Sequence, residues 1–120
     1  MVSRLSYTLD CSDPERLSAF WEQALGYSCR GKFGQYWPLE SRESADEPAF
    51  TLQQVSERKS GKNRMHVDIH VTTDLDEEAR RLEALGARRV SDEPVVMGNH
   101  SWFVMEDPEG NEFCVVHRPE

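Results

Sequence analysis

Apolar and polar positions follow a definite order in the first half of the chain. Residues 5–10 alternate apolar and polar side chains, which predicts a strand with one face on a core. Ser12 or Asp13, followed by Pro14, then marks the start of a helix, because a short polar side chain caps free amides and proline suits the first turn. Gly26 ends this helix, since glycine readily adopts the left-handed conformation of a helix exit. The apolar stripe of the predicted helix consists of Leu17, Phe20, Trp21, Ala24 and Leu25.

The second half of the chain repeats this plan. Residues 24–26 and 84–86 share the sequence Ala-Leu-Gly at an offset of 60. Residues 65–71 alternate as the first strand does, and Thr73 or Asp74 caps the helix that follows. The pattern therefore predicts two modules of the same kind.

Each half also carries short strand patterns after its helix. Two such modules, about residues 1–55 and 65–120, are each too small to cover their own sheet. We therefore predict one α+β domain over residues 1–120, in which two βαβββ modules pair their sheets and the helices lie outside. The short strands are expected near residues 27–30, 35–39 and 49–55, and at 102–106 and 112–117 around a turn at 107–111.

Composition narrows the range of partners and locations. A chain of 120 residues with 38% hydrophobic content can bury one core of ordinary size. Its net charge of −8 disfavours nucleic acid as a partner. We find neither a membrane-helix pattern nor a secretory signal, so we expect a cytoplasmic protein without a membrane partner. The cysteines Cys11, Cys29 and Cys114 lack CxxC spacing and are expected to be reduced thiols.

Five short motifs stand at fixed places along the chain, at residues 13–17, 20–21, 25–27, 63–68 and 107–111. Together with the repeat, their order and spacing resemble the vicinal oxygen chelate superfamily, and most closely its small bacterial glyoxalase-like domain proteins. This superfamily includes glyoxalase I, extradiol dioxygenases and bleomycin-resistance proteins. The resemblance implies a curved mixed sheet around a cavity. It also implies a homodimer, because such modules pair within one chain or across two and strand edges stay available.

The resemblance also implies where metal ligands would lie. In metal-dependent members, four ligands face the cavity, from the first and the last strand of each module. These places fall at Ser6, Gln53, His66 and Cys114, with Gln54 as the alternative to Gln53. Only His66 is a customary ligand of the family, and Cys114 would bind zinc well only as a thiolate with better companions. We therefore expect no metal at these degenerate positions and no cofactor, although the pattern leaves room for a divalent metal.

Strand alternation places the polar side chains of His66, Asp68 and His70 on one face of residues 65–71. One interpretation makes the histidines metal ligands, or an acid–base pair in which Asp68 orients an imidazole. The other makes them hydrogen-bonding groups on a pocket floor that hold a ligand or waters. Residues two apart on a strand lie about 7 Å apart and seldom chelate one ion unaided, which favours the second interpretation.

Further candidates come from aromatic and thiol side chains. Trp37 and Trp102 fall on short strands, where each suits a pocket or a core equally well. Cys114 could act as a nucleophile, but the sequence offers no helix N-terminus to activate it, so a buried, inert thiol is favoured. The complete set of predicted ligand-binding residues is Ser6, Thr8, Trp37, Gln53, His66, Asp68, His70, Trp102 and Cys114.

Three kinds of function are compatible with these features, in this order. The first is a small-molecule-binding protein without the usual metal site, which sequesters an aromatic or natural-product ligand as bleomycin-resistance-type relatives do. The second is a lyase, isomerase or dioxygenase that uses a divergent metal site or acid–base chemistry by His66 and Asp68. The third is an interaction module that uses its exposed sheet edges for dimerisation or a partner domain.

Overall fold

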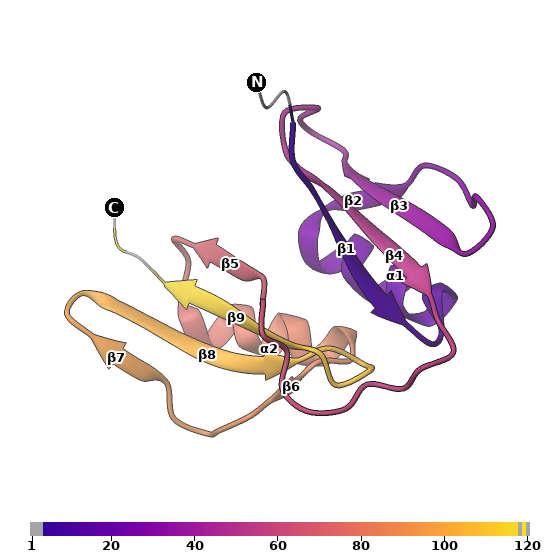
Figure 1. Cartoon of the computed structure of the whole chain (residues 1–120). Coiled ribbons are helices and arrows are strands. Elements are labelled where there is room, and N and C mark those ends of the chain that lie inside the picture. Colours follow the sequence, from indigo (N-terminus) through magenta and orange to yellow (C-terminus); the bar gives the residue numbers. More distant parts are fainter. Residues whose placement is uncertain (1–3, 118, 120) are drawn as a thin grey trace. The chain divides into compact units, whose positions relative to one another are not determined.

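The chain folds as two compact units, the first ending at Lys59 and the second beginning at Ser60 (Figure 1). The computed structural model describes residues 4–117 and 119. Each unit contains one helix and one mixed sheet, so the α+β prediction is confirmed. The pairing of the two sheets around a cavity stays a prediction. Neither helix of the described chain has the length and apolar character of a membrane-spanning segment.

The first unit contains a four-stranded sheet in the order β1-β4-β3-β2. Strand β1 runs parallel to β4, and the other neighbours are antiparallel. A parallel pair needs a crossover between its strands, and the helix lies in that connection. The elements are β1 (Ser6–Cys11), α1 (Pro14–Leu25), β2 (Tyr27–Cys29), β3 (Tyr36–Ser41) and β4 (Ala49–Gln54).

Helix α1 begins and ends where the sequence predicts. The Asp13 side chain accepts a hydrogen bond from the Arg16 amide at 3.2 Å, which caps the helix. Gly26 follows the last turn in the left-handed conformation, with φ of 71°. The buried Trp21 ring packs against Phe50 of β4 with ring centroids 5.0 Å apart. The helix therefore covers the face of the first sheet to which Phe50 belongs.

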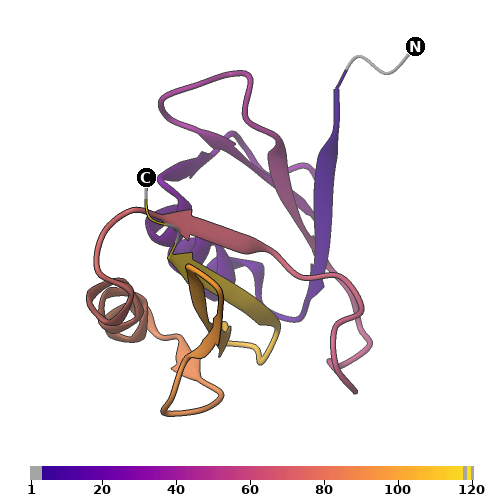
Figure 2. The same ribbon diagram turned by 90° about the vertical axis from the view of Figure 1, so that its left-hand side faces the viewer.

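The second unit contains the sheet β5-β9-β8-β6, and β7 also pairs with β8. Here β5 runs parallel to β9, and the other pairs are antiparallel. Figure 2 shows α2 viewed almost along its axis beside these strands. The elements are β5 (Asp68–Val71), α2 (Leu75–Leu85), β6 (Arg88–Arg89), β7 (Val95–Met97), β8 (His100–Glu106) and β9 (Glu112–His117).

Strand β5 is shorter than the alternating pattern predicts. The pattern begins at residue 65, whereas the strand begins at Asp68. Asp68 pairs with Cys114, so in the same register Met65 would pair with Asn111, which lies in the turn before β9. The partner strand has not yet begun there, and the parallel ladder cannot extend to residue 65. The short strands β6 and β7 were not among the predicted elements.

The predicted turn at residues 107–111 joins β8 to β9 and is confirmed. Asp107 is buried, and its Oδ1 accepts hydrogen bonds from the amides of Glu109 and Asn111, both at 2.9 Å. The Asn111 side-chain amide also donates to the Asp107 carboxylate. Gly110 supplies the positive φ, at 84°. The buried polar groups of this turn are therefore hydrogen-bonded to one another. These bonds fix the turn and so the residue at which β9 starts.

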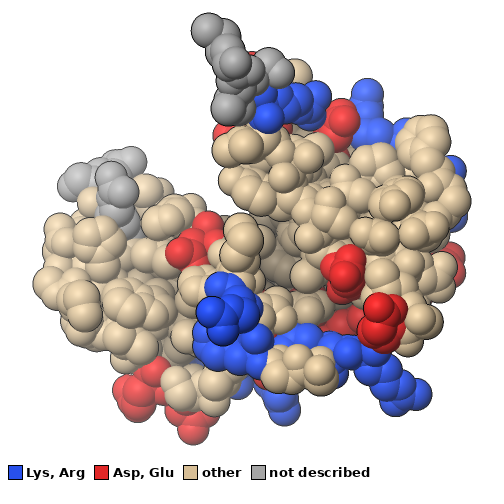
Figure 3. Space-filling view, in the orientation of Figure 1, with Lys and Arg blue, Asp and Glu red and all other residues tan. Residues whose placement is uncertain are grey.

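Charged side chains of both signs lie on the face of the molecule shown in Figure 3. Large uncharged areas are also visible there.

Candidate functional site

The two faces of the second sheet differ in what covers them. Arg89 bonds to Asp76 of α2 at 2.8 Å and lies over the ring of Phe103, so Phe103 belongs to the α2 side. His117 Nδ1 lies 2.8 Å from the carbonyl oxygen of Thr73, just before α2, so alternate residues of β9 also point there. We call the opposite face of this sheet, which points away from α2, the distal face.

Strand pairing gathers the predicted residues of the second unit on the distal face. Asp68 of β5 lies opposite Cys114 of β9, and the next distal pair is His70 with Val116. Val116 in turn lies opposite Trp102 of β8. Because residues in register on adjacent strands point to the same side, all five side chains share this face. Alternation along β5 predicts only that Asp68 and His70 share a face. The register with β9 and β8 adds Cys114, Val116 and Trp102.

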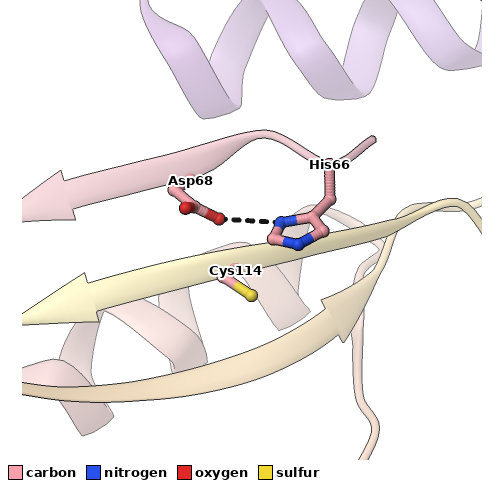
Figure 4. Close-up of side chains that lie close together, drawn as sticks. All are labelled: His66, Asp68 and Cys114. Carbon is pink, nitrogen blue, oxygen red and sulfur yellow. Dashed lines mark hydrogen bonds and ion pairs between the residues drawn. The ribbon is translucent and has the colours of Figure 1, made fainter. Parts of the chain in front are cut away.

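Asp68 and Cys114 of this face converge with His66, which precedes β5, near the β5 edge of the sheet (Figure 4). His66 Nδ1 lies 2.9 Å from Asp68 Oδ1. One ligand atom from each of His66, Asp68 and Cys114 can be chosen so that all three lie within 4.8 Å of one another. The side chains of His66 and Asp68 are 39% and 43% exposed, whereas Cys114 is buried. Among the described residues, His70 is outside this group.

Two contacts hold the segment before β5 beside β9. The Asn63 amide donates a hydrogen bond to Glu112 Oε1 at 2.9 Å. The Cys114 amide donates to the carbonyl oxygen of Val67, also at 2.9 Å. These bonds place His66 next to the edge of the sheet although it precedes the strand. Glu112 was not among the predicted site residues, since its role depends on the pairing of β5 with β9.

Cys114 is a poor nucleophile in this setting. Burial raises the pKa of its thiol to about 11, and the nearby Asp68 charge and a hydrogen bond to Asp68 act in the same direction. Lys62 opposes them more weakly. The thiol is therefore neutral near pH 7, and it lacks the thiolate character that a catalytic cysteine needs.

The predicted residues of the first unit do not form a comparable group. Ser6 lies opposite Ala49 at the start of β4, whereas Gln53 lies opposite Asp10 near its end. Four residues along a strand span about 13 Å, so the structure does not bring Ser6 and Gln53 together. Thr8 lies between them along the sheet, opposite Thr51. In the 60-residue repeat Thr8 matches Asp68, so the counterpart of Cys114 is Thr51 rather than Gln53.

The remaining residues of the first unit have separate surroundings. Trp37 is half-buried on β3, and the Lys32 ammonium lies 4.3 Å from the centroid of its ring. The Gln54 side-chain amide donates to the carbonyl oxygen of Ser12 at 3.3 Å. Gln54 therefore supports the helix start rather than joining Gln53.

Comparisons with known proteins agree with this architecture. The family model described as "Glyoxalase-like domain" matches residues 6–116. A glyoxalase/bleomycin resistance protein/dioxygenase family enzyme from Burkholderia phytofirmans PsJN has a similar structure, with 20% identity and a TM-score of 0.78. That match covers 96% of this chain and 98% of the other. No match was found among the curated proteins.

Two further solved structures show the same fold. One is a glyoxalase/bleomycin resistance protein/dioxygenase from Nocardioides, with 20% identity, a TM-score of 0.74 and coverage of 100% of this chain and 87% of that one. The other is a mutant of the fosfomycin resistance protein FosX from Listeria monocytogenes, complexed with manganese(II) and 1S,2S-dihydroxypropylphosphonic acid. It is 18% identical, with a TM-score of 0.77 and coverage of 100% and 93%. At these identities the likeness shows the fold alone.

Proposed function

The chain belongs to the glyoxalase-like domain family, and on that premise we propose that it binds a small organic molecule on the distal face of its second sheet. In this proposal the protein sequesters an aromatic or natural-product ligand and does so without the usual four-ligand metal site of the superfamily. The ligand would be held by contacts that the second unit itself supplies.

One observation carries this proposal, namely the row formed by Trp102, Val116 and His70 on three adjacent strands. The row begins with a broad aromatic ring, passes over an aliphatic side chain and ends at an imidazole. Small-molecule sites typically combine such apolar surface with a few polar groups that fix orientation. A planar ligand with one polar end matches this arrangement, because its ring can stack on indole while the polar end reaches the edge of the sheet.

The neighbouring polar edge extends the same surface. Asp68 is an acceptor, and His66 and His70 can each donate or accept depending on their protonation. The side chains of His66 and Asp68 are more than one third exposed, so a bound molecule can reach them. A ligand that lies along the row could therefore exchange hydrogen bonds with this edge.

A thermal-shift screen with EDTA present tests the proposal. The panel contains planar aromatics, thiol conjugates and natural-product antibiotics. Compounds that raise the melting temperature of the wild-type protein are expected to lose most of that effect with Trp102→Ala and His70→Ala. Val96→Ala is the matched control, because Val96 lies on the same sheet but points to the opposite side of the strand pair from Trp102. Equal stabilisation of Trp102→Ala and the control, or a panel that stabilises nothing, would contradict the proposal.

A second candidate function is acid–base catalysis of the lyase or isomerase kind. The 2.9 Å contact between His66 Nδ1 and Asp68 Oδ1 favours it. When Nδ1 carries the proton and donates a hydrogen bond to Asp68, Nε2 is left unprotonated and can act as a base. In this case His66→Ala would abolish turnover of a bound compound while leaving its binding largely intact. If every stabilising compound binds but none is turned over, acid–base catalysis is excluded for these compounds and ligand binding is the supported function.

We also propose that the units act as two modules of one domain, in a cytoplasmic homodimer. Strands β1 and β5 each lie at an edge of their own sheet. Leu5 and Met65, which precede them, are 63% and 77% exposed. Exposed apolar side chains at unpaired edges favour association. Light scattering coupled to size exclusion is expected to give twice the mass of the chain, and a monomeric mass at high concentration would contradict this part of the proposal.

A further inference from the structure

We infer that His66, Asp68 and Cys114 form a three-ligand site for zinc, built wholly within the second unit. The inference goes beyond small-molecule binding and does not depend on it. It also departs from the family arrangement, in which each half of the chain contributes ligands. The additional ligand is Asp68, which falls at none of the family's ligand positions and would bind the same ion as His66 and Cys114.

The donor atoms fit a tetrahedral ion after a small adjustment. The three ligand atoms lie within 4.8 Å of one another before any ion is considered. Bond lengths of about 2.0 Å to nitrogen or oxygen and 2.3 Å to sulfur separate tetrahedral ligands by roughly 3.3–3.5 Å. A separation of 4.8 Å must therefore shrink by about 1.3 Å. His66 and Asp68 are partly exposed and can change rotamer to do so, whereas Cys114 is fixed in the core of its strand.

The backbone explains why these residues meet. Asp68 and Cys114 are direct partners on adjacent parallel strands, whose axes lie about 4.8 Å apart. Residues 64 and 65 form a bend before β5, so His66 leaves the strand path and its ring lies beside Asp68 instead of about 7 Å away. Two residues on one strand seldom chelate an ion unaided, but here Cys114 on the neighbouring strand β9 supplies a third donor atom.

The donor set selects the kind of metal. A thiolate, an imidazole and a carboxylate suit zinc, whereas magnesium, calcium and manganese prefer oxygen ligands. On binding, the Cys114 S–H bond breaks, the sulfur electron pair forms the Zn–S bond, and the proton passes to the buffer. The thiolate and the Asp68 carboxylate together balance the charge of Zn²⁺. Three protein ligands leave a fourth position open for water or a ligand.

Glu112 is assigned a supporting role. Its carboxylate accepts a hydrogen bond from the Asn63 amide at 2.9 Å and so fixes the segment that carries His66. It is a positioning residue in this proposal, comparable to the outer groups that orient ligands at metal sites.

Cobalt(II) titration of the EDTA-treated full-length protein tests the site. Co²⁺ replaces Zn²⁺ in such sites and reports a bound thiolate through a sulfur-to-metal charge-transfer band. We expect one equivalent of Co²⁺ to produce this band and Zn²⁺ to remove it. Cys114→Ser should abolish the band and lower zinc affinity, measured against a chromophoric chelator, by more than about 100-fold. Asp68→Asn and His66→Gln should each lower it at least about 10-fold.

Matched controls keep the outcome decisive. Cys29→Ser removes a thiol of the first unit, and His100→Ala removes a histidine of β8 that is outside the group; both should leave the band and the zinc affinity unchanged. If Cys114→Ser fails to fold, His66→Gln decides, because His66 is exposed and outside the core. A band that persists in Cys114→Ser, or the absence of stoichiometric binding, would overturn the inference. Stabilisation by organic compounds in EDTA would be untouched, so the two proposals fail separately.

Discussion

Asp68 of β5 and Cys114 of β9 are direct partners in a parallel ladder, and a carboxylate oxygen of Asp68 lies within 4.8 Å of the Cys114 sulfur. The strand register thus sets a carboxylate against a buried thiol. Without a metal, burial and then the Asp68 charge raise the pKa of the thiol and keep it protonated. This accounts for a cysteine that is inert as a nucleophile yet well placed as a metal ligand.

The raised pKa of Cys114 predicts a stability change in alkaline solution. A thiol whose pKa is raised by folding stabilises the protein below the pKa of the unfolded thiol, near 9, and this stabilisation disappears as the pH approaches the folded pKa of about 11. In EDTA, the free energy of unfolding should therefore fall between pH 9 and 11, with roughly 3 kcal/mol as the upper limit for this group. Urea unfolding at a series of pH values measures it.

Tyr27 requires a control in that experiment. Burial, followed by the charges of Glu47 and Tyr7, raises the pKa of its phenol as well, so it adds a loss of stability in the same direction. Cys114→Ala isolates the thiol, and its unfolding free energy should decline less steeply from pH 9 to 11 than that of the wild type. Parallel curves for the two proteins would refute the assignment.

The cysteines should differ strongly in their reaction with an alkylating reagent. A pKa of about 11 instead of 9 leaves roughly 100-fold less thiolate at pH 8, and burial slows Cys114 further. Cys29 is only partly buried, so it should be modified first, followed slowly by Cys11 and Cys114. Peptide mass spectrometry after timed exposure to iodoacetamide measures the order. Early labelling of Cys114 in the native protein is the contrary result.

Removing the Asp107 side chain should destabilise the second unit by about 2–4 kcal/mol. The buried carboxylate accepts from the amides of Glu109 and Asn111, and Asp107→Ala would leave these donors without their acceptor. Denaturant unfolding at pH 7 provides the measurement. Asp92→Ala, at an exposed position in the same unit, should change stability by less than about 0.5 kcal/mol. Similar effects of the two substitutions would count against the role of Asp107.

Local sequence patterns predict the elements of this fold well. The caps Asp13 and Gly26 fix α1, and the turn at residues 107–111 has the residues that its geometry requires. Alternation also places Asp68 and His70 on one face. These features depend on interactions between residues close in the chain, so the sequence contains the information that determines them.

Register between distant strands is what the sequence leaves open. Nothing near Cys114 indicates that it faces Asp68, because the pairing depends on where the turn before β9 ends. The register between distant strands also separates Ser6 from Gln53 and makes β5 shorter than predicted. Overlaying family positions supplied His66 and Cys114, but Asp68 joins them only through the pairing of β5 with β9 and the bend before β5.

The central claim is that the chemistry of this chain lies on the distal face around His66, Asp68 and Cys114. Two-dimensional NMR of ¹⁵N-labelled protein, titrated with Zn²⁺ to one equivalent, tests it most directly. The account predicts that amide signals of residues 66–70 and 112–116 shift, together with the ring nitrogens of His66, while those of β1 and β3 stay in place. Shifts confined to the first unit, or none at all, would contradict it.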